Sequence, residues 1–244
     1  MSTLVKVARY HLVQPFQYLL LAWMVLAFAF VVNVIIFGIT PVSHHTALTA
    51  NGLVSVASMD GRYTGALCSF FLMFLVLGVQ SIGRSLPFGL TLGVSRRSYY
   101  TGTALLAVLL ACADGLALTA LQAIERVTDG WGVNMGFFRV PYLLDGPWYQ
   151  TWLTSFVGLA LLFVYGMWFG IVYRRWSLFG TLTFVAAQVT VLLGAALVIT
   201  WAHGWTGVGH FFTGLTVAGL TGLLAVLAAA LLVGGHATIR RATV

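Results

Sequence analysis

The sequence predicts an all-α polytopic membrane protein with six transmembrane helices, and three observations support this prediction. First, 60% of the 244 residues are hydrophobic and only 7% are charged, whereas soluble domains carry about a quarter charged residues. Second, six apolar stretches reach the roughly 20 residues that a helix needs to cross the hydrocarbon core of a bilayer. Third, the positive charges gather in alternate connections, as they do in multi-pass membrane proteins.

The limits of the six spans are expected where apolar runs give way to polar residues, near residues 16–39, 63–83, 101–124, 151–173, 177–201 and 211–235. Each span is expected to be a helix, because a helix pairs all its backbone polar groups internally where no water is present. The connections leave no room for a soluble domain. We therefore expect residues 1–244 to form a single transmembrane domain without a nucleotide-binding domain.

The distribution of charge predicts the orientation of the chain. An even number of spans places nine cations and no acid on the side of the N-terminus: Lys6, Arg9, Arg84, Arg96, Arg97, Arg174, Arg175, Arg240 and Arg241. The opposite side holds three cations, Arg62, Arg126 and Arg139, against four acids: Asp60, Glu125, Asp129 and Asp145. The positive-inside rule then predicts that both termini are cytoplasmic. Cations at helix ends suit anionic lipid headgroups, and they do not indicate a nucleic-acid partner.

The residues before the first span predict a short amphipathic helix in the cytoplasmic interface. Leu4, Ala8 and Leu12 share one helical face, Lys6 lies on another, and Pro15 ends the helix. The alternative is a frayed tail that carries topogenic charges.

Two outer connections invite interpretation. The longer one, residues 125–150, is rich in aromatic side chains: Trp131, Phe137, Phe138, Tyr142, Trp148 and Tyr149. Such rings favour the headgroup layer, so we expect the loop to lie on the outer membrane face, and the alternative is a substrate gate. Residues 202–212 form a link too short for a domain, with glycines that suit a brief re-entrant turn.

The sequence lacks the motifs of the enzyme classes that a membrane protein of this size suggests. Its only lysine, Lys6, lies outside any phosphate-binding loop, and no His-Glu-x-x-His helix is present. Ser95 follows Gly93 and Val94 in a cytoplasmic loop, whereas an intramembrane serine protease needs its serine deep in a span. We therefore expect neither a catalytic site nor a cofactor or metal on this chain.

Asp114 is the one acid expected inside a span. It follows the start of the third span by a helical rise of about 20 Å, which is near the bilayer middle. An ionisable group there costs about 2.5 to 3.5 kcal/mol, so it should face the bundle interior and have a partner. The polar candidates on other spans are Asn33, Gln80 and Gln188. One interpretation is that these four residues line a substrate path or a proton relay. The alternative is that Asp114 is protonated and only stabilises the bundle through a hydrogen bond.

Small residues mark two helix faces that permit close approach. The fourth span carries Gly166 and Gly170 in a Gly-x-x-x-Gly pattern. The sixth span carries a line of small residues: Ala218, Gly222, Ala225 and Ala229. They serve either an oligomer interface or packing within one bundle.

The stretch RSLPFGLTLGVSRRSYYTG, residues 84–102, forms the second cytoplasmic connection. Pro87 cannot continue the second span, while Gly89 and Gly93 permit tight turns. Ser95 is a favourable N-cap for a helix that begins at Arg96 and leads into the third span. The sequence therefore predicts a compact cytoplasmic elbow.

Six spans, both ends inside, an amphipathic N-terminal helix and an elbow reading Leu-Gly-Val-Ser-Arg-Arg-Ser-Tyr-Tyr-Thr-Gly resemble the permease subunit of an ABC-2 type bacterial exporter. The architecture matches over the whole chain, and the local motif covers residues 86–102. The resemblance implies the ABC-2, type V exporter-like fold in a bacterial plasma membrane. Family members often have helical turns between the fifth and sixth spans on the outside, where this sequence predicts only a short link.

The resemblance also implies a mechanism with partners. The elbow would be the coupling helix that docks on a separate ATP-binding cassette ATPase, through Gly93, Val94, Ser95, Arg96, Arg97 and Tyr99. ATP and Mg would then bind to the partner ATPase, present in two copies. A second permease subunit, identical or similar, would complete the pathway as a dimer.

A mostly apolar interior favours export of a hydrophobic or amphiphilic substrate such as a drug, an antimicrobial peptide or a lipid. The alternative function is a stand-alone, proton-coupled secondary transporter that uses Asp114.

Overall fold

The computed structural model describes residues 20–39, 47–49, 52–54, 67–83, 95–140 and 143–241, and these are mostly helical. The helices of the described residues are α2 (Leu21–Ile39), α3 (Leu67–Gly83), α5 (Arg96–Val127), α6 (Trp148–Trp201), α7 (Trp205–Gly214) and α8 (Val217–Arg241). A π-helical turn, η2 (Gly130–Asn134), follows α5. The predicted N-terminal interfacial helix and residues 84–94 of the elbow lie outside the described residues.

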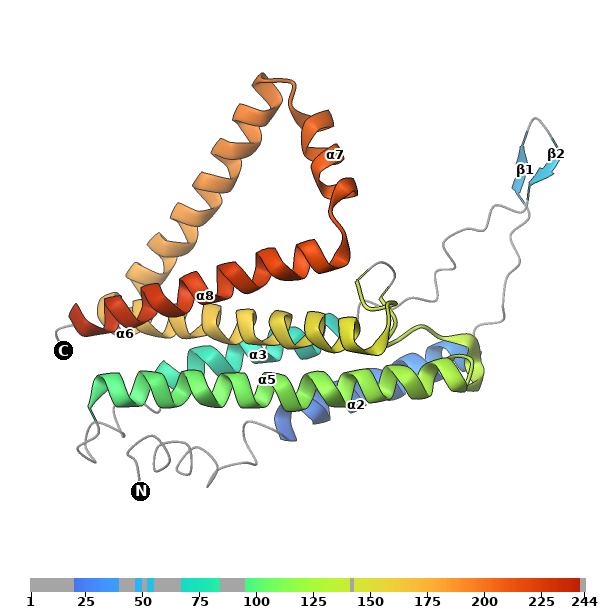
Figure 1. Cartoon of the computed structure of the whole chain (residues 1–244), viewed down its shortest axis with the longest axis horizontal. Helices are drawn as coiled ribbons and strands as arrows, with labels where there is room; N and C mark the ends of the chain where they lie inside the picture. The colour runs from blue at the N-terminus through green and yellow to red at the C-terminus, as the bar shows by residue number, and fades with distance from the viewer. Residues whose placement is uncertain are drawn as a thin grey trace.

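The first part of α6 is the central helix of the bundle. It packs against α3, α5 and α8, which lie along it in Figure 1. Fully buried side chains of α3 and α6, among them Phe70, Phe74, Phe163 and Met167, form the centre of the hydrophobic core. The second predicted span therefore lies against the fourth, although about 80 residues separate them in sequence.

Four described helices are long and apolar enough to cross a membrane: α2, α5, α6 and α8. Helix α3, with 17 residues, is shorter. These helices agree with a multi-pass membrane protein, and the count of six spans stays a prediction.

The fourth and fifth predicted spans form one element of 54 residues that is broken at a corner. Ser177 has φ 57° and ψ −155°, a conformation that only glycine adopts without strain. Gly180 makes the corner possible, because a Cβ atom there would overlap the side chain of Trp176. The predicted break between residues 173 and 177 is thus confirmed. Beyond it, the second part of α6 turns away from the bundle (Figure 1).

Helix α7 corrects the prediction for the link between the fifth and sixth spans. Residues 205–214 form a helix that leads from the end of α6 back to α8 (Figure 1). The glycines of this segment, Gly207 and Gly209, each disfavour a helix by about 1 kcal/mol relative to alanine, so the sequence suggests a turn. The apolar residues around them nevertheless continue as a helix.

A small hairpin departs from the all-α prediction. Strand β1 (Ala47–Thr49) pairs antiparallel with β2 (Gly52–Val54), with Leu48 opposite Leu53. The Asn51-Gly52 pair is a common hairpin signal, but it does not predict this register, because Gly52 is already paired with Thr49.

Glycines bring α3 and α6 into backbone contact. A Cβ atom at Gly166 would overlap the carbonyl oxygen of Leu75, and one at Gly170 would lie 2.8 Å from the Cβ of Ile82. The Gly-x-x-x-Gly of the fourth span therefore packs within one bundle. In the small-residue line of α8, by contrast, a Cβ atom at Gly222 would meet nothing within 4 Å.

Replacing Gly166 by alanine should destabilise the bundle by about 1 to 3 kcal/mol, because two backbones would have to separate. The matched control is Gly222→Ala, which meets open space and should leave stability unchanged or slightly higher. Thermal unfolding of the purified protein in detergent measures both. Equal effects of the two substitutions would contradict this packing.

Candidate functional site

The start of α5 is the described part of the predicted elbow. Ser95 caps the helix as predicted, with φ −65° and ψ 146°, and its Oγ accepts a hydrogen bond from the amide of Ser98 at 3.2 Å. Arg97 is exposed and Arg96 is half-buried. The basic pair thus follows directly on a defined helix start.

Two adjacent tyrosines connect this helix start to the bundle. Tyr99 is 1% exposed, and its hydroxyl donates to the carbonyl of Ser81 at 2.7 Å. Tyr100 donates to the carbonyl of Leu232 at 3.0 Å, and its ring lies 5.9 Å from that of His236. The elbow end of α5 is therefore bonded to the last turn of α3 and to α8.

The position of Tyr99 corrects one predicted contact. Of the six residues that the resemblance assigns to an ATPase contact, three lie at the accessible start of α5: Ser95, Arg96 and Arg97. Tyr99 instead points into the bundle and is not available to a partner at the surface. It lies two residues, or about 200° of helical rotation, after the exposed Arg97, which places it on the opposite face of α5. Gly93 and Val94 lie outside the described residues.

Charge is distributed unevenly along the bundle. The start of α5, the corner of α6 and the end of α8 lie at one end (Figure 1). This end carries Arg174 and Arg175, and the guanidinium carbon of Arg175 lies 4.6 Å from the ring centre of Trp176. The acids at the end of α5 and in the loop that follows lie at the opposite end, where Arg126 and Arg139 pair with Asp145. Cations are therefore present at both ends of the bundle, while these acids lie at one end.

Asp114 is buried in the middle of α5, with 6% of its surface exposed. Its Oδ1 accepts a hydrogen bond of 2.8 Å from the indole Nε1 of Trp23 on α2. The predicted burial is confirmed, and this bond places the first turn of α2 beside the middle of α5. A buried indole N–H needs an acceptor, which makes tryptophan a polar partner in spite of its apolar ring.

The predicted polar path is not assembled. Asn33 donates to the carbonyl of Ala29 in its own helix at 2.7 Å. Gln188 accepts a bond of 2.6 Å from the hydroxyl of Tyr165, and Gln80 is half-buried on α3. The expectation that these three side chains are the partners of the buried acid is wrong, because a tryptophan takes that place.

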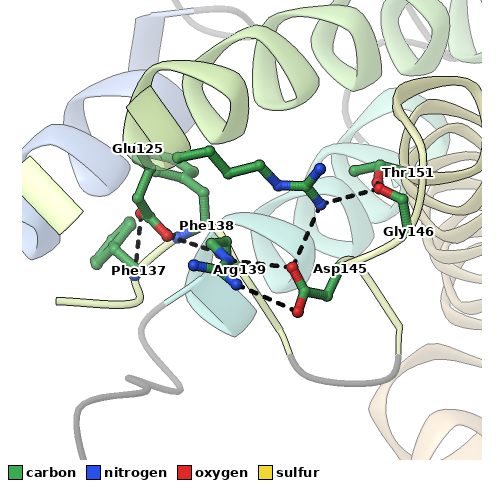
Figure 2. A network of polar contacts seen from close by, with 8 residues as sticks. Glu125, Phe137, Phe138, Arg139, Asp145, Gly146 and Thr151 are labelled. Atoms are coloured by element: carbon green, nitrogen blue, oxygen red, sulfur yellow. Dashed lines mark hydrogen bonds and ion pairs between the residues drawn. The ribbon is translucent and has the colours of Figure 1, made fainter. Parts of the chain in front are cut away.

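Glu125 is a buried acid whose role the sequence did not reveal. It is 1% exposed, and its carboxylate accepts four hydrogen bonds from the loop after α5. Figure 2 shows it beside Phe137, Phe138 and Arg139. Oε2 accepts from Trp131 Nε1 at 3.1 Å, Phe137 N at 3.1 Å and Phe138 N at 2.8 Å. Oε1 accepts from Arg139 N at 3.1 Å. One signal was available: an acid in the last turn of a helix opposes the helix dipole and so needs specific donors.

A cluster of charges at the surface closes the same loop. The carboxylate of Asp145 pairs with Arg139 at 3.1 Å and with Arg126 at 3.3 Å (Figure 2). Arg126 also donates to the carbonyl of Gly146 at 2.9 Å. All three charged side chains are 38% exposed, so each pair contributes at most about 1 kcal/mol. The buried Glu125 therefore orders this loop more than the surface pairs do.

The second outer loop is in part a cap on the bundle. Phe137 and Phe138 are buried, and their rings lie 5.4 and 6.0 Å from the ring of Phe30 on α2. The expectation that the whole loop lies on the membrane face is wrong for these residues, because Glu125 holds their backbone against the end of α5. Trp148 and Tyr149 are exposed, as an interfacial position requires.

Comparisons with protein-family models, with curated proteins and with solved structures gave no match. Within the described residues, no group of three or more histidine, cysteine or acidic side chains is placed to hold a metal ion. The function is therefore inferred from the sequence resemblance and from the geometry of this chain.

Glu125→Ala should lower the free energy of unfolding by about 3 to 5 kcal/mol, because it leaves buried N–H groups without an acceptor. The matched control is Asp129→Asn, which removes an exposed charge from the same loop and keeps a side chain that tolerates the left-handed conformation there (φ 48°). Thermal unfolding in detergent distinguishes the two. A stable Glu125→Ala protein would show that the carboxylate does not hold the cap.

Proposed function

We propose that this chain is the permease subunit of an ABC-2 type exporter in a bacterial plasma membrane. A separate ATP-binding cassette ATPase, in two copies, would bind ATP and Mg and hydrolyse the nucleotide. The observation that carries the proposal is the start of α5. There a capped helix carries Arg96 and Arg97, and the tyrosine pair that follows bonds it to α3 and α8.

Helix α7 supports the same proposal. Family members often have helical turns between the fifth and sixth spans, and residues 205–214 are helical. This helix brings the link closer to the family pattern, while the longer connection between α5 and α6 remains a departure from it.

In the proposed mechanism the ATPase would bind the elbow through Ser95, Arg96 and Arg97. ATP-driven closure of the paired ATPases would move the elbow as a rigid body. Tyr99 would pass this movement to α3 and Tyr100 would pass it to α8, since each hydroxyl bonds a backbone carbonyl of that helix. With 32 residues, α5 is about 48 Å long, so it would carry the movement to the outer end of the bundle.

The exported substrate would be hydrophobic or amphiphilic, in keeping with the apolar interior of the bundle. A second permease subunit, a copy of this chain or a similar one, would complete the pathway.

Reversing the charge of the elbow, with Arg96→Glu and Arg97→Glu together, should uncouple ATP hydrolysis from export. Export should fall at least about tenfold, within the usual range of coupling free energies. The matched control reverses Arg174 and Arg175, which lie at the same end of the bundle outside the elbow. Substrate efflux and ATPase rate are measured in the reconstituted complex. Unchanged export by the elbow variant would overturn the coupling role.

The partner itself can be tested by purifying the chain from its native membrane in mild detergent. A polypeptide with a phosphate-binding loop should come with it in equal amount, and the elbow variant should lose that polypeptide. Transport by the purified chain without such a partner would refute the exporter proposal.

Asp114→Asn distinguishes the exporter from the proton-coupled alternative. Asparagine keeps an oxygen that accepts the Trp23 N–H, so an Asp114 that acts as a strut predicts unchanged transport and an unchanged pH profile. Loss of transport together with a changed pH profile would favour the secondary transporter.

A further inference from the structure

A cavity of about 170 Å³ lies in the outer half of the bundle, between α2, α5 and the cap. Its walls come from three elements: Trp23, Leu26, Ala27 and Phe30 of α2, Leu121 of α5, and Trp131 and Phe138 of the loop. Four of these seven side chains are aromatic. Residues far apart in sequence therefore line one space, which is partly open at the exposed Ala27.

The polar atoms of the walls are already engaged. The indole N–H of Trp23 is bonded to Asp114, and that of Trp131 is bonded to Glu125. An indole has no other polar atom, and the remaining wall side chains are hydrocarbon. A polar group that entered would lose its hydrogen bonds to water and find no replacement from these side chains.

We propose that this cavity is a binding site for an apolar hydrocarbon group, an aromatic ring or a segment of alkyl chain. Its volume is close to that of apolar cavities of about 150 Å³ that stay dry and take up benzene. The rings around it already meet edge to face, with Phe30 and Trp131 centred 4.9 Å apart at 72°. A further ring can join such a cluster in the same geometry.

The two buried acids make the walls rigid. Asp114 and Glu125 are eleven residues apart on α5, which is close to three full turns, so they stand on one face of the helix about 16 Å apart. Each holds one tryptophan by its N–H. Indoles fixed in this way do not have to be ordered when a ligand binds, which lowers the entropic cost of binding.

The hydrocarbon group has two possible sources, the acyl chain of a membrane lipid or a free apolar molecule. The site does not depend on the proposed exporter function, because its occupation needs neither an ATPase nor transport. Binding and export can therefore fail independently.

The test uses the full chain in lipid nanodiscs and two photoreactive probes. One is free 3-trifluoromethyl-3-phenyldiazirine, and the other is a phosphatidylcholine that carries a diazirine on its acyl chain. Labelled positions are mapped by mass spectrometry. We expect saturable labelling around Leu121 and Phe138, which are not exposed, and toluene should prevent it. At Phe28, which is 73% exposed on α2, labelling by the free probe should rise linearly because it reports only partition into lipid.

Two variants fill the cavity from opposite walls, Ala27→Leu and Leu121→Phe, so the test does not depend on one of them folding. Each should reduce the labelling of cavity positions about tenfold, as expected for loss of about 1.4 kcal/mol of binding free energy. The control is Met24→Phe, which adds bulk at an exposed position of α2 and should change nothing.

The two probes also identify the source. Labelling by the free probe alone assigns the site to a small apolar molecule, and labelling by the lipid probe assigns it to an acyl chain. Labelling by either probe supports the site if the cavity-filling variants abolish that labelling. The proposal is overturned if neither probe labels the cavity above the level at Phe28, or if the filling variants have no effect. It is also overturned if phenyltrimethylammonium competes better than toluene, since that would indicate a cation–π site.

Discussion

Every buried polar group of a membrane protein must find its partner within the protein, and helix α5 is where this chain meets that constraint. Four of its buried polar side chains bond four different elements. Tyr99 reaches α3, Tyr100 reaches α8, Asp114 reaches α2 and Glu125 reaches the outer loop. In lipid there is little hydrophobic driving force for helices to associate through apolar contacts, because lipid tails are as apolar as leucine. These bonds therefore fix the register of the surrounding elements on α5, and packing fills the space between them.

This arrangement bears on how a movement at one end of the bundle would reach the other. Arg97 is followed after one residue by the tyrosine pair, so the exposed start of α5 and its anchors in α3 and α8 lie within one helical turn. The middle and the far end of the same helix hold Trp23 and the cap. A displacement of the elbow along the axis of α5 acts on all four bonded elements together, because an α-helix transmits axial load through its continuous ladder of hydrogen bonds.

Sequence reasoning predicted the features that depend on local chemistry. The cap at Ser95, the break near residue 177 and the burial of Asp114 follow from residue type and position. The partners of the buried acids did not follow, because a tryptophan in an apolar stretch does not reveal which acceptor its N–H group meets. Helix α7 was missed because Gly207 and Gly209 favour a turn, yet the segment is helical without burying any of its residues.

The corner of α6 divides the molecule into two parts of different character. Before Ser177, glycines bring α6 into backbone contact with α3, and this packing leaves no space for sliding. After it, the second part of α6 turns away, but two contacts near the corner join it to the first part. Tyr165 bonds Gln188, and the rings of Phe169 and Phe184 lie 5.3 Å apart. The helices on both sides of the corner are continuous, so any change in their relative direction falls on the few residues around Ser177. That position has a strained backbone and lies beside Arg174 and Arg175, at the same end of the bundle as the elbow. The capped start of α5 and the strained corner of α6 thus lie at the same end of the bundle.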